Sequence, residues 1–100
     1  MIQPPILTVL ITTYNRALVL DALLDMLASY QQRGLAFNIL VSDDCSTDNT
    51  TETCNKWSSR LQGFKHILTE RNLGMDNNFR NVYENFDTEY CWLLGDTRHI

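Results

Sequence analysis

TVLITTYNR at residues 8–16 and ILVSDDCSTD at residues 39–48 decide the fold, because each stretch passes from an apolar run into a polar loop. Continuous apolar runs of this length, rich in Val, Ile and Leu, are typical of strands that are covered on both faces of a parallel sheet. In such sheets ligands bind beyond the carboxyl ends of the strands. The two polar loops therefore predict one shared ligand site at that edge.

Expected strands and helices alternate along the chain. Short apolar runs predict strands at residues 7–12, 37–41, 64–68 and 90–94. Apolar residues that recur every three or four positions predict a first helix over residues 16–33, with Asn15 as its N-cap and Gly34 at its end. Two further helices are expected. The buried side of the first carries Cys54, Trp57 and Leu61, and that of the second carries Met75, Phe79, Val82 and Phe86.

This order predicts one α/β domain over residues 1–100. Its βαβαβαβ sequence of elements favours a mostly parallel sheet of about four strands with flanking helices in three α/β/α layers. The chain ends six residues after the last expected strand. We therefore expect an uncovered sheet edge there, which belongs either to the front half of a longer domain or to a surface for homo-oligomer formation.

Composition and charge exclude several classes of protein. Of the 100 residues, 44% are hydrophobic and 20% are charged, which is typical of a folded domain and not of a disordered chain. A net charge of −4 argues against nucleic acid as a partner, because such binding needs many Lys and Arg side chains on phosphates. No apolar run is long enough for a membrane span, and residues 1–5 lack the pattern of a signal peptide. We therefore expect a cytoplasmic protein.

The cysteines and glycines exclude further classes. Cys45, Cys54 and Cys91 are odd in number and form no C-x-x-C pair, so neither a disulfide framework nor a zinc cluster is indicated. The loop after residue 12 has no G-x-G-x-x-G turn, and no P-loop motif occurs anywhere. A dinucleotide-dependent oxidoreductase and a P-loop NTPase are therefore excluded.

Four segments of the chain together resemble the N-terminal, donor-binding half of a family 2 glycosyltransferase with the Rossmann-like GT-A fold. They are VLITTYNR at 9–16, ILVSDDCSTDNT at 39–50, ERNLGMDNNFRN at 70–81 and EYCWLLGD at 89–96. They occur in the order and spacing of the family and extend over nearly the whole chain. The resemblance implies a nucleotide-sugar donor, held at the edge that the two polar loops share.

The resemblance also implies roles for single residues. The nucleotide would contact Thr13, Tyr14, Asn15 and Arg16 after the first strand, Asp43 or Asp44 after the second, Arg71 and Asn72 after the third, and Asp96 after the fourth. Asp44 is the first choice for the carboxylate that accepts hydrogen bonds from base or ribose. Asp96 stands in the position of the first acid of the metal motif and would hold Mg²⁺ or Mn²⁺, although Thr97 and Arg98 replace the acids that usually follow.

The residues themselves leave simpler structural roles open at these positions. Asn15 can be an N-cap and Tyr14 a loop anchor that packs on the sheet. The acids of the second loop can serve only as turn and cap residues, which is the role we expect for Asp48.

The implied reaction is inverting transfer of a sugar from a nucleotide diphosphate, in first place a UDP-sugar, to an acceptor hydroxyl. We expect the general base beyond residue 100. The resemblance also implies cell-envelope polysaccharide biosynthesis, and, as part of a longer protein, a place at the inner face of the membrane. The alternative is a nucleotide-binding or assembly module that keeps the fold without catalysis.

Overall fold

The computed structural model describes residues 5–94, apart from the side chains of residues 75 and 76, and residues 1–4 and 95–100 lie outside the description. Seven elements follow one another as expected: β1 (Leu7–Thr13), α1 (Ala17–Gln32), β2 (Asn38–Asp43), α2 (Thr50–Ser58), β3 (Phe64–Leu68), α3 (Met75–Tyr83) and β4 (Tyr90–Leu93). The predicted βαβαβαβ order is confirmed.

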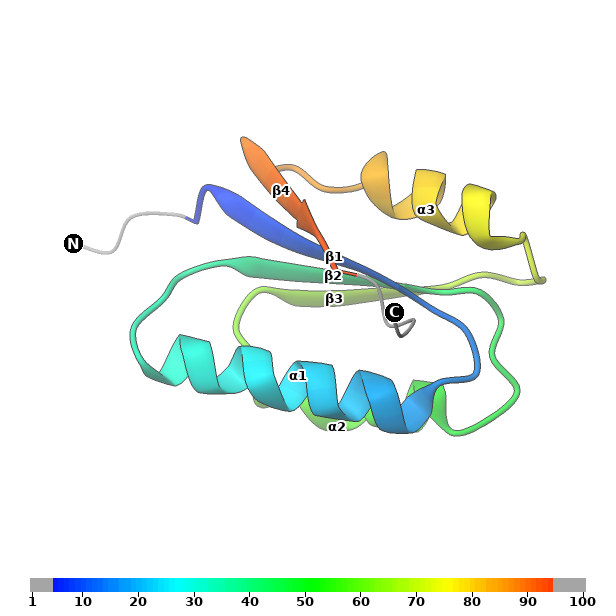
Figure 1. Cartoon of the computed structure of the whole chain (residues 1–100), viewed down its shortest axis with the longest axis horizontal. Coiled ribbons are helices and arrows are strands. Elements are labelled where there is room, and N and C mark those ends of the chain that lie inside the picture. The colour runs from blue at the N-terminus through cyan, green and yellow to red at the C-terminus, as the bar shows by residue number, and fades with distance from the viewer. Residues whose placement is uncertain (1–4, 95–100) are drawn as a thin grey trace, which may run out of the picture.

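All strand pairs in the sheet are parallel, and the strand order is β3-β2-β1-β4. Helices α1 and α2 cover one face and α3 covers the other (Figure 1), which confirms the three layers. Because β1 and β2 are the central pair, Thr13 lies opposite Asp43 at the carboxyl ends of the two strands. The topology thus brings the two polar loops together.

The core consists of two clusters, one on each face of the sheet, because successive side chains of a strand point to opposite faces. Val9 and Ile11 face α1 and α2, where they join a cluster that includes Leu24 and Trp57. The residue between them, Leu10, faces α3 and packs in a second cluster with Leu40 and Val82. Both faces of the central strands are buried, which explains their continuous apolar sequence.

Some predicted boundaries were wrong by a few residues. Helix α1 begins at Ala17, because Asn15 has a left-handed backbone with φ of 51° and the N-cap residue Arg16 has φ of −135°, so neither residue is helical. Helix α2 ends at Ser58 and α3 at Tyr83. Leu61 and Phe86 therefore pack on the core from the turns after these helices.

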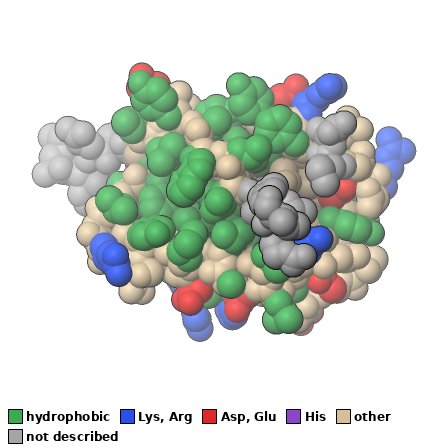
Figure 2. Space-filling view, viewed as in Figure 1, with side chains coloured by type: hydrophobic (Ala, Val, Ile, Leu, Met, Phe, Trp, Pro, Cys, Tyr) green, Lys and Arg blue, Asp and Glu red, His purple; other side chains and the backbone are tan. Residues whose placement is uncertain are grey.

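An apolar area flanks β4. Tyr90, Trp92 and Leu93 are 57%, 48% and 47% exposed, so the expected uncovered region around this strand is present. A hollow of about 320 Å³ opens between Trp92, Tyr30 and Phe37, and Figure 2 shows hydrophobic side chains gathered on this face. Self-association through β4 stays a prediction. Within the described residues, no helix has the length and apolar character needed to cross a membrane.

Candidate functional site

Three loops meet at the carboxyl ends of the strands: residues 14–16 after β1, 44–49 after β2 and 69–74 after β3. Backbone hydrogen bonds join the first loop to the second and the second to the third at the strand ends. The Asp44 N–H donates to the Thr13 carbonyl at 3.0 Å, and the Thr69 N–H donates to the Asp43 carbonyl at 3.0 Å. These bonds extend the sheet pairing beyond the strands and give the loops a firm base.

Asn15 links the first loop to the second. Its backbone N–H donates to Ser46 Oγ at 2.8 Å, and its Oδ1 accepts the N–H of Thr47 at 2.7 Å and that of Asp48 at 3.3 Å. The expectation that Asn15 caps α1 is wrong, because its side-chain oxygen points into the second loop. The N-terminus of α1 is served instead by Asp48, whose Oδ2 accepts the Ala17 N–H at 3.2 Å.

Asp48 also fixes the start of α2. Its Oδ1 accepts the Thr50 N–H at 3.0 Å and the Thr50 hydroxyl. Burial raises the pKa of Asp48, but the hydrogen bonds from Thr50 and Ala17 outweigh burial and hold this pKa below its ordinary value of 3.8. The N-cap residue of α2 is Asn49, and Asp48, one position before it, accepts hydrogen bonds from the first residues of both helices. One consequence is that the first N–H of α1 is already occupied by an anion.

Asp43 lies below the loops on the side of α1 and α2. Only 1% of it is exposed, and its Oδ1 accepts the N–H and hydroxyl of Ser46. Its other oxygen, Oδ2, and Thr13 Oγ1 are buried without a hydrogen-bond partner among the described residues. Burial, and secondly the charge of Asp43, raise the pKa of the Cys54 thiol to about 12. Cys54 is therefore a neutral core thiol.

Asp44 points to the third loop. Its Oδ1 accepts the Leu73 N–H at 2.6 Å and its Oδ2 accepts the Gly74 N–H at 3.0 Å, with 4% of the residue exposed. Gly74 has φ of 87°, a conformation that favours glycine. Asp44 therefore holds the segment that leads into α3, with both oxygens engaged by backbone donors.

The remaining predicted residues differ in position. Tyr14 is 45% exposed, and Arg16 is exposed beside a shallow hollow of about 390 Å³ at the start of α1. Arg71 and Asn72 are exposed on the third loop, where Asn72 Oδ1 accepts the Gly74 N–H at 2.9 Å. The first three predicted clusters thus share one edge, whereas Asp96 lies outside the described residues.

Among the described side chains, no group of three or more His, Cys, Asp or Glu residues is arranged to hold a metal ion. Asp96, the predicted metal ligand, lies outside the described residues.

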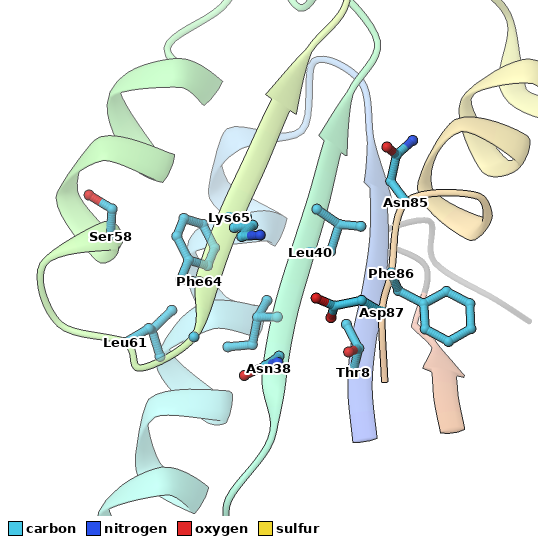
Figure 3. A pocket seen from close by; sticks show the side chains of 12 residues that line it. Thr8, Asn38, Leu40, Ser58, Leu61, Phe64, Lys65, Asn85, Phe86 and Asp87 are labelled. Atoms are coloured by element: carbon cyan, nitrogen blue, oxygen red, sulfur yellow. The ribbon is translucent and has the colours of Figure 1, made fainter. Parts of the chain in front are cut away.

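A second polar hollow, of about 330 Å³, lies at the other end of the sheet. Figure 3 shows Thr8, Asn38 and Lys65 around it, near the amino ends of their strands, with Asp87 from the turn after α3. Ligands of open parallel sheets bind at the carboxyl ends. The three-loop edge is therefore the better candidate.

Sequence reasoning missed a buried polar group that holds α3 on β2. Asn78 is 3% exposed, donates through Nδ2 to the Ser42 carbonyl at 3.1 Å and accepts the Ser42 hydroxyl. Asn81 Nδ2 donates to Ser42 Oγ at 3.1 Å. The available signal was Asn78 itself, which is a polar residue on the apolar side of a predicted helix. This group sets the position of α3 and of the loop before it.

Comparisons with known proteins agree with this geometry. The sequence model of Glycosyl transferase family 2 matches residues 8–96. Abequosyltransferase RfbV from Salmonella typhimurium is 34% identical over 87 residues, which cover 85% of this chain and 26% of that protein. Validoxylamine A glucosyltransferase from Streptomyces hygroscopicus subsp. jinggangensis is 41% identical over 66 residues, which cover 66% of this chain and 15% of that protein.

Among solved structures, residues 1–349 of S. aureus TarS in complex with UDP-GlcNAc superpose with a TM-score of 0.79 at 26% identity, over 90% of this chain and 26% of that one. The chain therefore spans about a quarter or less of the length of these relatives. The match to the family extends over all seven elements of the fold. The chain belongs to Glycosyl transferase family 2.

Proposed function

We propose that this chain is the donor-binding part of a glycosyltransferase that uses a UDP-sugar. The observation that carries the proposal is the hydrogen-bonded pair of loops after β1 and β2, in which Asn15, between the exposed Tyr14 and Arg16, is bonded to Ser46 and Thr47. The TarS complexes with UDP-GlcNAc and UDP support the choice of nucleotide, since the fold of TarS is similar over 90% of this chain.

The roles of the loop residues follow from their chemistry. Tyr14 offers an aromatic face on which a base can stack, and Arg16 offers a guanidinium for ribose or phosphate oxygens. Asp44 or Asp43 would accept the N–H of the base or a ribose hydroxyl, because an ionised acceptor makes the stronger hydrogen bond. A carboxylate has about four acceptor positions, so Asp44 can accept a ligand proton beside its two backbone donors and the Thr69 hydroxyl at 3.4 Å.

Thr13, Asn15, Arg71 and Asn72 complete the proposed nucleotide site. Thr13 Oγ1 has no partner within the described residues, and Asn15 keeps the N–H₂ group of its amide for a ligand. Arg71 and Asn72 extend the site along the third loop, where both are exposed.

Asp96 is the proposed ligand for Mg²⁺ or Mn²⁺. A carboxylate oxygen fits these hard cations, which bind through one or two carboxylates together with water and substrate phosphates. Such an ion would offset the charge of the departing diphosphate. The family fold supports this proposal, and a mannosyltransferase from Pyrobaculum calidifontis with a similar fold, at a TM-score of 0.70, was solved with GDP-Man and Mn²⁺.

The proposed reaction is displacement of the nucleotide diphosphate by an acceptor hydroxyl with inversion at the sugar. The part of the reaction that this chain performs is binding and orientation of the donor. A general base on the acceptor side is needed as well, and we place it beyond residue 100. A cell-envelope polymer is the proposed acceptor, supported by a poly(ribitol-phosphate) N-acetylglucosaminyltransferase of Staphylococcus aureus that is 35% identical over 75% of this chain.

Isothermal titration calorimetry with UDP, in the presence and absence of Mn²⁺, tests this proposal. We expect saturable heat for UDP that is lost in Tyr14→Ala and Arg16→Ala and retained in Asp25→Asn, an exposed charge change in the middle of α1. Absence of binding by the intact chain, or equal binding by all variants, would overturn the assignment.

A further inference from the structure

Asp48 occupies a position between two helices and two loops. Its Oδ2 accepts the first N–H of α1 from Ala17, 31 residues earlier in the sequence, and its Oδ1 accepts the N–H of Thr50 at the start of α2. The backbone N–H of Asp48 in turn donates to Asn15 Oδ1. The Asp48 side chain therefore binds the backbone at the end of the first loop, and the Asn15 side chain binds the backbone of the second loop.

This exchange fixes the first loop on both sides of Arg16. Asn15 is held by Ser46 and Thr47, and Ala17 is held by the Asp48 carboxylate. Tyr14 and Arg16, which flank Asn15, have exposed side chains. Since the loop is held at Asn15 and Ala17, the second loop fixes the backbone from which these two side chains extend.

We propose that Asp48 is a positioning residue for nucleotide binding, which acts through the backbone of residues 15–17 and does not touch the nucleotide. The inference rests on the proposed function, and it adds a residue that the donor-contact set does not contain. Its carboxylate holds Tyr14 and Arg16 in the arrangement that takes the base and ribose.

The expected loss of affinity follows from the fraction of molecules in which the first loop is in the binding-competent arrangement. If the loop of the free protein takes the binding-competent arrangement in only a tenth of molecules, the apparent affinity falls about tenfold, whatever the ligand contacts are. Loss of the carboxylate removes the hydrogen bond from Ala17 and, at the start of α2, the two from Thr50, and we expect the competent population to fall by about this factor of ten. Because the effect is on the part of the site that binds base and ribose, the affinities for uridine and for UDP should fall by the same factor.

The test compares Asp48→Ala and Asp48→Asn with Asp25→Ala, which removes a carboxylate from the exposed side of α1. Titration calorimetry measures the affinities for uridine and for UDP. Amide hydrogen exchange at Ala17, measured by NMR without ligand, reports the loop directly, and melting temperatures identify variants that do not fold. Asp48→Asn keeps the size of the side chain and one acceptor oxygen, so it provides the measurement where Asp48→Ala is unfolded.

We expect Asp48→Ala to lower the affinities for uridine and for UDP by the same factor, about ten or more. Asp48→Asn should lower both affinities by a smaller factor, and Asp25→Ala should leave them unchanged. Exchange at Ala17 should accelerate in both Asp48 variants. Unchanged affinities, or a change for UDP alone, would overturn the proposal, the second because it indicates direct action on the diphosphate. If the unaltered chain binds neither compound, the proposed function fails, whereas Ala17 exchange still decides whether Asp48 holds the loop.

Discussion

Replacement of Asp44 by asparagine is a sharp test of how the third loop is held. Asp44 accepts backbone N–H groups of Leu73 and Gly74, at 2.6 Å and 3.0 Å, on its two different oxygens. Asparagine has one oxygen, so its N–H₂ group must face one of these two donors. A hydrogen bond to a charged group contributes about 1.5–3 kcal/mol and a neutral one about 1 kcal/mol. We therefore expect Asp44→Asn to lower the free energy of unfolding by about 2–4 kcal/mol.

The assay is urea unfolding followed by far-UV circular dichroism, with thermal unfolding beside it. For a domain of this size 1 kcal/mol shifts the thermal midpoint by about 4–8 °C, so a fall of about 10 °C or more is expected. Asp25→Asn, with the same change of charge on the exposed side of α1, should stay within about 0.5 kcal/mol of the unaltered chain. A similarly small effect of Asp44→Asn would refute the reasoning, since it would mean that Asp44 does not hold the loop.

Three further predictions concern stability. Cys45 has φ of 61°, so Cys45→Gly should raise the unfolding free energy by about 1 kcal/mol, which thermal unfolding measures; a loss of stability would contradict the strain. Asn78→Ala removes two hydrogen bonds to Ser42 and should cost about 2–3 kcal/mol in urea unfolding, and a cost below about 0.5 kcal/mol would contradict the buried network. Hydrogen bonds from Lys56 and Trp57 hold the pKa of Asp21 below its ordinary 3.8, so its stabilisation is present at neutral pH and is lost as the pH falls below 3.8. Asp21→Asn should accordingly be less stable than the unaltered chain at pH 7 and closer to it at about pH 3, and an equal difference at both pH values would contradict the shift.

The parallel sheet and the order of the elements along the chain could be predicted because periodicity and topology rules act on long segments, whereas the order of the strands within the sheet was not predicted. The apolar runs at residues 8–12 and 39–41 are strands, and the helix that connects them makes the pair parallel, which places both carboxyl ends at one edge. Element ends were less certain. The end of α2 at Ser58 depends on the turn that follows it, and Leu61 is buried whether or not the helix continues to it.

The hydrogen bonds of the loops could not be predicted from the sequence. Asn15 and Asp48 are both ordinary cap residues by type, and local rules assign each of them to the helix that follows it. In the fold, Asp48 serves the helix that precedes its own strand, because β1 and β2 end side by side. Such a contact depends on the relative position of two loops, which local sequence does not encode.

The adjacent acids Asp43 and Asp44 show a general rule that sequence reasoning could have used. Successive residues at a strand end point to opposite sides of the sheet, so neighbouring carboxylates are not interchangeable. Asp43 turns toward Cys54 on the side of α1 and α2, whereas Asp44 turns toward Gly74 and the segment that enters α3. Each acid therefore fixes a different wall of the proposed nucleotide site. Substitutions at Asp43 should loosen the loop that contains Ser46, and those at Asp44 should release the third loop, so that the two acids act on donor binding through separate parts of the fold.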